Sequence, residues 1–336
     1  MTTTPNRSRR SVVISIVAPA FNEEPSLPVL CAEVTKVMEA QGCKFEIVIG
    51  ENGSSDNSLA ILRELHAKDP RVNYVGLSRN FGSQGGLVAG LEYCRGDVVI
   101  TMDADLQHPP AVIPRLLDAW EAGYDIVNTY RENKTHSGWL RLALNNFYFW
   151  MMREFAGISL ESRQSDFRLF DRRALNALLS LPERYKFLRG LTHWIGFDQT
   201  SIGYVADKRL AGATKYKVLD LIGMAVRGVT SFSIVPLRFF SLVGFLVSLG
   251  AMSYGFIILV SALIGQTMPT GFASLAVGVF FLGGIQLIGI GVLGEYVGHI
   301  FDEARRRPVY LVRETSLATG PAVSASPSAA REPRRN

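Results

Sequence analysis

The chain has 336 residues and a net charge of +5, from 35 basic and 30 acidic residues. Much of the positive excess lies at the two ends, so no internal basic face points to a nucleic-acid partner. Its three cysteines, Cys31, Cys43 and Cys94, are too few and too irregularly spaced for a disulfide framework or a zinc site. We expect them to be small core residues of a protein in a reducing compartment.

Between residues 12 and 129, short β-rich runs alternate with helical patterns. This alternation predicts an α/β domain, over residues 12–212, with a mostly parallel sheet and helices packed on its faces. Residues 1–11 are polar and basic, and we expect a flexible tail there. The expected strands are Val12–Ala18, Phe45–Gly50, Val72–Leu77, Val98–Met102 and Asp125–Thr129. The expected crossover helices are Leu27–Ala40 and Asp56–Ala67.

The stretch from Phe239 to Gly294 contains no Asp, Glu, Lys or Arg over 56 residues. A spanning helix needs about 20 apolar residues, so two are predicted, at about 237–263 and 272–294. The connecting loop carries no positive charge, and the positive-inside rule places the α/β domain and both termini in the cytoplasm, with the hairpin in the cytoplasmic (inner) membrane. The flanking basic residues are Arg227, Arg238, Arg305, Arg306 and Arg307.

Three segments around this hairpin carry their own expectations. Residues 213–236 mix apolar and charged positions in a pattern that suits a helix lying along the membrane surface, although an ordinary amphipathic helix packed on the domain is the alternative. Residues 297–314 are expected to form a cytoplasmic C-terminal segment. Residues 315–336, rich in Ala, Ser and Pro, are expected to be disordered.

An acidic cluster follows the predicted strand that ends at Met102. Along an extended chain, alternate residues point the same way, so Asp103, Asp105 and Gln107 would present two carboxylates and an amide oxygen on one side. Such an oxygen-only set suits Mg²⁺ or Mn²⁺, with diphosphate oxygens completing the coordination. A single Asp-x-Asp pair is often only a turn or a cap, so the other strand ends decide its meaning.

The other strand ends are also unusually polar, and ligands of such sheets bind beyond the carboxyl ends of the strands. Pro19–Glu23 offers a rigid turn, an aromatic face and polar groups suited to a nucleobase or ribose. Glu51–Asp56 places hydrogen-bonding side chains before a helix N-terminus, which favours anions. The glycines of Ser78–Gly86 permit close approach of the backbone.

In this order, the four motifs resemble the family 2 glycosyltransferases of the GT-A fold. The closer resemblance is to the membrane-anchored polyprenyl-phosphate glycosyltransferases, a group that includes dolichyl-phosphate mannose synthase and the bactoprenol glucosyltransferases. It covers about Ile14 to Arg313 and extends to Ser165–Leu169, Ala213–Tyr216 and Thr230–Ser233. The breadth of the match makes a chance resemblance improbable.

The resemblance implies a GT-A domain that transfers a sugar, with inversion, from a nucleotide sugar to a polyprenyl phosphate for cell-envelope glycan or lipid modification. UDP-sugars are the favoured donors and GDP-mannose is second. It implies Mg²⁺ or Mn²⁺ on Asp103, Asp105 and Gln107. The family commonly has Asp-Asp-Gly-Ser where this chain has Glu51-Asn52-Gly53-Ser54, which weakens inference of the nucleotide. The residues expected to bind the nucleotide sugar are Pro19, Phe21, Glu23, Glu51, Asn52, Ser54, Asn80, Gly82, Asp103, Ala104 and Asp105.

On the acceptor side, Asp166 matches the position often proposed as the base in such enzymes, and with Asp105 it is the expected catalytic pair. An acceptor phosphate is already largely anionic at cytoplasmic pH, so Asp166 would orient it or balance charge more than remove a proton. A salt bridge to Arg168 or a helix cap is the alternative. The candidates for binding the acceptor phosphate are Arg131, Lys134, Arg141 and Lys215. The five histidines have no metal-ligand spacing and are expected to be structural.

Two other functions remain open at this point. One is a glycosyltransferase of the same fold with a sugar or diacylglycerol acceptor, although the Gln-x-x-Arg-Trp motif usual in processive synthases is absent from the sequence. The other is a noncatalytic membrane scaffold, suggested by Glu51 and Asn52. Glycines in the second apolar segment permit close helix packing, and a tetramer or dimer is expected.

Overall fold

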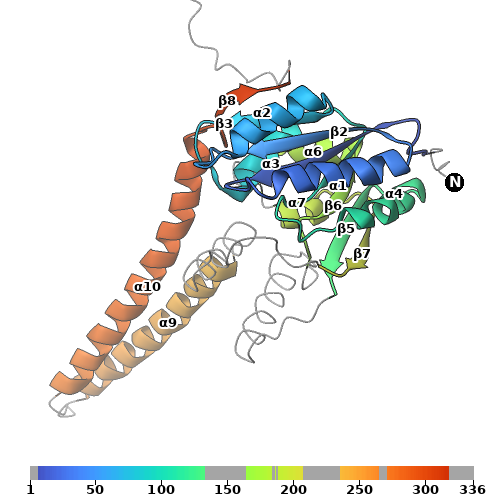
Figure 1. Cartoon of the computed structure of the whole chain (residues 1–336). Coiled ribbons are helices and arrows are strands. Elements are labelled where there is room, and N and C mark those ends of the chain that lie inside the picture. The colour runs from blue at the N-terminus through green and yellow to red at the C-terminus, as the bar shows by residue number, and fades with distance from the viewer. Residues whose placement is uncertain are drawn as a thin grey trace, which may run out of the picture. The chain divides into compact units, whose positions relative to one another are not determined.

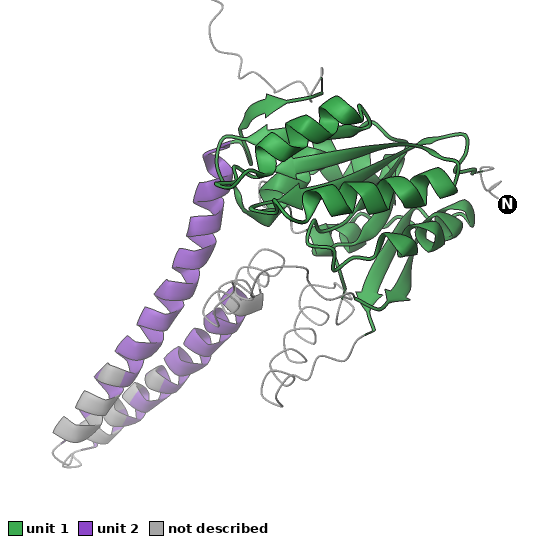
Figure 2. Ribbon diagram, in the orientation of Figure 1, with its two compact units in different colours: residues 1–149, 158–215, 308–336 green, residues 150–157, 216–307 purple. Residues whose placement is uncertain are grey.

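An eight-stranded sheet is the centre of the first of two units in the computed structural model of the protein (Figures 1 and 2). The structure describes residues 7–132, 164–183, 186, 188–206, 235–264 and 271–317. The strands are β1 (Val13–Ala20), β2 (Lys44–Glu51), β3 (Val72–Leu77), β4 (Val98–Thr101), β5 (Ile126–Arg131), β6 (Arg168–Asp171), β7 (Gln199–Tyr204) and β8 (Val312–Thr315), in the order β7-β5-β6-β4-β1-β2-β3-β8. The predicted α/β architecture with a mostly parallel sheet is confirmed.

The topology of the sheet creates the place for a ligand. β1, β2 and β3 follow one another outward in parallel, and the chain then returns to the other side of β1 to form β4, also parallel. The loops that leave β1 and β4 therefore diverge at the carboxyl edge of the sheet, and such a reversal opens a crevice there. β6 and β8 are antiparallel to their neighbours β4, β5 and β3.

Helices cover this sheet with apolar stripes. In α1, buried residues recur at Leu27, Leu30, Val34 and Met38, the spacing of one helical face. The helices of the first unit are α1 (Leu27–Ala40), α2 (Ser58–Lys68), α3 (Gly82–Tyr93), α4 (Ile113–Glu121), α6 (Arg172–Ser180) and α7 (Leu188–Trp194), with a short 3-10 turn, η1, at Pro110–Val112. The three cysteines are free and buried, as expected for core residues.

The helix α3 was not predicted, because its first turn is rich in glycine. Glycine is needed where α3 meets β2, because a Cβ at Gly50 would lie 2.0 Å from the carbonyl oxygen of Gly86. The expected start of α2 at Asp56 also shifts to Ser58. The Asp56 carboxylate instead accepts hydrogen bonds from the backbone N–H groups of Glu24 and Ser58.

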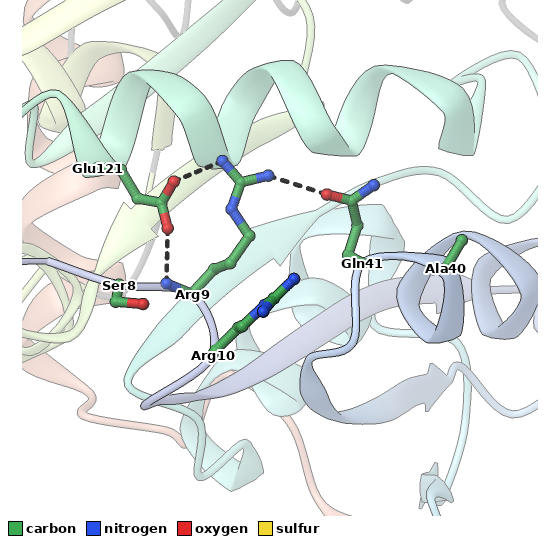
Figure 3. A pocket seen from close by; sticks show the side chains of 6 residues that line it. All are labelled: Ser8, Arg9, Arg10, Ala40, Gln41 and Glu121. Carbon is green, nitrogen blue, oxygen red and sulfur yellow. Dashed lines mark hydrogen bonds and ion pairs between the residues drawn. The ribbon is translucent and has the colours of Figure 1, made fainter.

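The N-terminal segment does not behave as a flexible tail from Arg7 onward. Arg7 pairs with Asp125 and lies over the ring of Trp120 at 5.6 Å. Arg9 pairs with Asp118 and Glu121 of α4 and donates to Gln41 at 2.9 Å. The contacts of Arg9 with Glu121 and Gln41 line a pocket at the amino-end edge of the sheet, away from the carboxyl ends of the strands (Figure 3). Acidic partners on α4 and just before β5 thus fix a segment that composition alone marked as unstructured.

The second unit contains two long helices, α9 (Val235–Leu263) and α10 (Phe272–Ala304). Both are long and apolar enough to cross a membrane. At about 1.5 Å per residue, each exceeds the ~30 Å hydrocarbon core. α10 continues ten residues beyond the predicted end at Gly294, through a more polar turn that includes Asp302 and Glu303. The predicted interfacial helix at 213–236 falls almost wholly outside the described residues.

After α10 the chain returns to the first unit as β8, which the sequence did not predict. β8 pairs with the edge of β3, and the backbone N–H of Ser78 donates to Leu311 at 2.9 Å. Glu314 forms a two-pronged ion pair with Arg63 of α2. Residues 315–317, expected to be disordered, are held by contacts such as that of Ser316 with the backbone N–H of Tyr74.

This pairing predicts that the two halves of the C-terminal region contribute unequally to stability. Removal of residues 308–336 should lower the melting temperature by several degrees, because β8 contributes a few backbone hydrogen bonds worth about 1 kcal/mol each. Removal of residues 318–336 alone should leave it unchanged. Thermal unfolding of both truncated proteins in detergent checks this, and equal melting temperatures would show that β8 does not support the sheet.

Candidate active site

The loops that follow β1, β2 and β3 are joined by hydrogen bonds at the carboxyl edge of the sheet. The backbone N–H of Asn22 donates to Ser54 Oγ at 3.0 Å, and the backbone N–H of Asn52 donates to the carbonyl of Ala20 at 2.9 Å. The Asn52 side chain donates both of its amide protons, to Asn80 Oδ1 and to the carbonyl of Gly82. The polar segments that the sequence placed at separate strand ends therefore meet in one place.

Two residues predicted to contact the nucleoside are deeply buried here. Glu51 and Asn52 keep 1% and 2% of their surface exposed. Glu51 accepts the backbone N–H of Ser54 at 2.5 Å, across a turn in which Gly53 has φ +65°. A Cβ on Gly53 would lie 2.5 Å from the backbone of Arg79, so this turn packs directly on the loop after β3. In the described residues, Glu51 and Asn52 shape the floor of the site, and their contact with a nucleotide stays a prediction.

The other residues predicted for the donor lie around the same edge. Asn80 Oδ1 also accepts the backbone N–H of Gly82 at 2.7 Å, which closes the first turn of α3. The backbone N–H of Glu23 donates to Ser58 Oγ at 3.0 Å. Pro19 and Phe21 lie at the end of β1 and just beyond it, and Ala104 is buried in the acidic turn. Their roles in donor binding are untested predictions.

The acidic segment is a turn and not an extended continuation of β4. β4 ends at Thr101, Leu106 has φ +64°, and the backbone N–H of Gln107 donates to Asp105 Oδ1 at 3.1 Å. The alternation argument that placed Asp103, Asp105 and Gln107 on one side was therefore wrong, because it assumed an extended chain. The three residues are brought near one another by the turn.

Carboxylates crowd this turn. Burial and the neighbouring charges of Asp166 and Asp105 together raise the pKa of Asp103 to about 7. Within the described part of the chain, no three His, Cys, Asp or Glu side chains are arranged to hold a metal ion. The available set is two carboxylates and one amide, all hard oxygen donors. This set fits Mg²⁺ or Mn²⁺ with other ligands from a substrate, and a divalent cation would relieve the crowding of negative charge.

His108 is the main residue of the site that sequence reasoning missed. It is wholly buried, and its Nδ1 accepts the backbone N–H of Asp103 at 2.8 Å. Its Nε2 lies 2.7 Å from Ser165 Oγ, and its ring stacks on Phe167 with centroids 5.2 Å apart. Burial lowers the pKa of His108 to about 4, which keeps the ring neutral and Nδ1 able to accept. The only feature of the sequence that could have indicated a role for His108 is its position directly after the acidic motif.

Asp166 lies between two arginines. Arg189 donates to both of its carboxylate oxygens at 2.9 Å, and Arg168, which is wholly buried, lies 3.4 Å from one of them. Burial alone would raise the pKa of Asp166, but the charge and hydrogen bonds of Arg189 outweigh it and lower the pKa to about 2. The salt bridge to Arg168, which was the alternative to a catalytic role for Asp166, is present, and the partner Arg189 was not foreseen. Such a carboxylate is a weak base.

Of the four predicted acceptor cations, Arg131 is described. It is the last residue of β5, and its Nε donates to Tyr204 Oη at 3.1 Å. Its charge acts on both Asp103 and His108, which places it beside the acidic turn. Lys134, Arg141 and Lys215 lie outside the described residues, so their placement stays a prediction.

An open, mostly parallel sheet with an acidic turn at its carboxyl edge defines a protein of the GT-A fold. Residues 15–179 match the model of the family described as glycosyl transferase family 2. A bactoprenol glucosyl transferase of Shigella phage SfII is 37% identical over 302 residues, which is 90% of this chain and 98% of that protein. The chain belongs to glycosyl transferase family 2.

The chain is also similar to two further proteins. The uncharacterized glycosyltransferase sll0501 of Synechocystis sp. is 38% identical over 305 residues, 90% of this chain and 96% of its own. A crystal structure of glucosyl-3-phosphoglycerate synthase from Mycobacterium tuberculosis, in complex with Mn²⁺, uridine-diphosphate and phosphoglyceric acid, is 19% identical. It covers 65% of this chain and 76% of that one, with a TM-score of 0.45.

The contacts of the buried His108 predict that the hydrogen bonds of its nitrogen atoms contribute more to stability than the packing of its ring. In His108→Phe the ring packing on Phe167 is kept, but the backbone N–H of Asp103 loses its acceptor, which should cost about 1–3 kcal/mol. Thermal unfolding measures this loss against His66→Phe, which removes a hydrogen bond to the backbone of Val72 away from the acidic turn. A His108→Phe protein as stable as wild type would show that the bond is not needed to hold the acidic turn.

Proposed function

We propose that this protein is an inverting glycosyltransferase that moves a sugar from a nucleotide sugar to the phosphate of a polyprenyl phosphate. A UDP-sugar is the favoured donor, and GDP-mannose is second. The observation that carries the proposal is the meeting of the acidic turn with the Asp166–Arg189 pair and Arg131 at the carboxyl edge of the sheet. The bactoprenol glucosyl transferases, similar over most of their length, support a polyprenyl acceptor.

On the donor side, Asp103, Asp105 and Gln107 would hold Mg²⁺ or Mn²⁺ against the diphosphate. A bound cation would neutralise negative charge on the departing nucleoside diphosphate. The chain's own residues prepare that site: His108 holds the backbone of Asp103, and Asn52 joins the loops after β2 and β3 beneath it. This arrangement fixes the carboxylates before a substrate arrives. Electrostatic catalysis is effective when the charged groups are already in place and need not reorganise during the reaction.

On the acceptor side, an oxygen of the lipid phosphate would attack the anomeric carbon as the bond from that carbon to the diphosphate oxygen breaks. A phosphate monoester has its second pKa near ~6, so the attacking oxygen carries a negative charge without help from a base. Arg131 would bind the phosphate, and Lys134, Arg141 and Lys215 are the other candidates. Asp166 would hold Arg189 and Arg168 in place and not accept a proton.

The apolar helices give the reaction its location. A polyprenyl chain is insoluble in water, and its phosphate lies at headgroup depth. A protein with α9 and α10 in the bilayer would therefore encounter its acceptor by diffusion within the same membrane. We infer from the flanking arginines that the sheet lies on the cytoplasmic side of the inner membrane. We also propose a tetramer or dimer. A sugar or diacylglycerol acceptor, whose attacking group would be a neutral hydroxyl, is the second candidate.

The direct test is a donor screen with the purified protein in lipid. Radiolabelled UDP-glucose, other UDP-hexoses and GDP-mannose are each supplied with polyprenyl phosphate, and label is counted in the organic phase. One UDP-sugar should give an acid-labile polyprenyl-phosphate-sugar of inverted anomeric configuration. Label transferred to diacylglycerol instead would favour the second candidate, and no transfer from any donor would favour a noncatalytic scaffold.

The metal assignment predicts a large loss in Asp105→Asn. The substitution removes one of two carboxylates and should reduce transfer more than about 100-fold, as should chelation of divalent cations from the wild-type protein. Asp118→Asn is the matched control, because Asp118 is exposed on α4 and pairs with Arg9. Transfer by Asp105→Asn at the wild-type rate, or wild-type transfer that persists in EDTA, would contradict the assignment.

The Asp166 assignment predicts a particular kinetic pattern. Asp166→Asn removes the charge that positions Arg189 and Arg168, so KM for the lipid acceptor should rise about tenfold while kcat falls less. Loss of a general base would instead lower kcat by about 100-fold or more with KM unchanged. Initial rates at varied acceptor concentration separate the two results, and the second would restore Asp166 as the base. Near-normal turnover and acceptor binding by Asp166→Asn would show that Asp166 has no role in the reaction.

A further inference from the structure

A chain of buried hydrogen bonds runs beneath the candidate active site from the acidic turn to Arg131. It begins where the backbone N–H of Asp103 meets His108 and continues from His108 Nε2 to Ser165 Oγ at 2.7 Å. Ser165 Oγ lies 3.0 Å from Tyr204 Oη, and Tyr204 Oη accepts Arg131 Nε at 3.1 Å. The chain thus joins four strand-end segments that lie far apart in the sequence.

The direction of most of these bonds follows from the donors and acceptors of each group. His108 Nδ1 accepts from Asp103, so the proton of the neutral ring is on Nε2, which lies 2.7 Å from Ser165 Oγ. The Tyr204 hydroxyl donates to Ser165 Oγ at 3.0 Å, and Ser165 Oγ also accepts the backbone N–H of Phe167 at 3.2 Å. Tyr204 Oη in turn accepts Arg131 Nε, so the Tyr204 hydroxyl is engaged both as a donor and as an acceptor.

Packing leaves these groups little freedom to move. Arg131 and Tyr204 are register partners on the parallel strands β5 and β7, so their side chains leave the sheet side by side. Tyr204 is 2% exposed, and its ring meets those of His108 and Phe167 edge-on with centroids 5.8 Å apart. The backbone N–H of Ser165 donates to Thr129 of β5 at 2.8 Å. The hydroxyl of Tyr204 is thus held in place, while Arg131 as a residue is half-buried.

We propose that Tyr204, held by Ser165 and His108, is a positioning residue that orients the Arg131 guanidinium toward the acceptor phosphate. The inference rests on the proposed function, because it gives Arg131 an anionic lipid phosphate to bind. Tyr204 does not touch the substrate in this account. It fixes the Nε edge of Arg131, so that the remaining guanidinium N–H groups face the site as a fork suited to phosphate oxygens.

The test is a double-mutant cycle on the full-length protein in nanodiscs. Tyr204→Phe keeps the ring and removes the acceptor of Arg131 Nε. KM for polyprenyl phosphate should rise about tenfold, the size expected for a lost hydrogen bond to a charged group, with kcat and donor KM within about twofold of wild type. Arg131→Ala should raise KM at least as much. Tyr204→Phe should add nothing to Arg131→Ala, because Tyr204 acts through Arg131.

Two further variants keep the result interpretable. Arg131→Lys keeps the charge but has no Nε donor, so it should resemble Tyr204→Phe even if that variant is poorly stable. Tyr93→Phe, at the buried C-terminal end of α3, controls for loss of a tyrosine hydroxyl and should match wild type. Titration calorimetry with a short-chain prenyl phosphate, against the same prenol without phosphate, measures the binding change without turnover.

The outcomes separate this inference from the function on which it rests. A wild-type protein that neither binds prenyl phosphate nor transfers sugar to polyprenyl phosphate would refute the proposed function, and the inference with it. A wild-type protein that does both while Tyr204→Phe keeps wild-type acceptor KM would overturn the inference alone. Effects of Tyr204→Phe and Arg131→Ala that multiply in the double variant would also overturn it, because they would show that Tyr204 acts independently of Arg131.

Discussion

One hydrogen bond, from the backbone N–H of Asp103 to Nδ1 of the buried His108, fixes the geometry on which the site depends. β4 stops pairing at its carboxyl end, and the N–H of Asp103 is the first beyond the ladder that needs a partner away from the sheet. A buried N–H without an acceptor is costly, so the imidazole holds the turn in one conformation. It can do so only while neutral, and burial, which lowers the pKa of His108 to about 4, keeps it neutral.

Charge is organised around that fixed turn. Asp103, Asp105 and Asp166 act on one another closely enough to raise the pKa of Asp103, while Arg131 and Arg189 oppose the rise. In the proposed reaction, the acidic turn would face a cation and a diphosphate, and the arginines would bind an incoming phosphate. Two anionic substrates can approach one another only if positive charge lies between and around them. Carboxylates follow β4, and cations lie at the end of β5 and near β6. Negative and positive charge therefore lie close together at one edge of the sheet.

Sequence patterns predicted β1 to β5 and the first two helices because continuous apolar runs and a 3.6-residue stripe are local signals. β8 pairs with β3 across more than 230 residues of chain, and no local pattern encodes such a partner. The acidic, polar and glycine-rich strand ends were found in sequence because each is a short motif. His108, Ser165 and Tyr204 act through their contacts with one another, and those contacts exist only after folding. Arg7 and Arg9 looked like tail charges for the same reason.

The central claim is that the acidic turn and Arg131 form the two sides of one transfer site. A structure of the full-length protein with a UDP-sugar analogue, Mn²⁺ and a prenyl phosphate tests it most directly. The account predicts Mn²⁺ bound by Asp103 and Asp105 on the diphosphate, with the prenyl phosphate on Arg131 facing the anomeric carbon. Nucleotide bound away from the carboxyl edge of the sheet, or prenyl phosphate with no contact to Arg131, would contradict it.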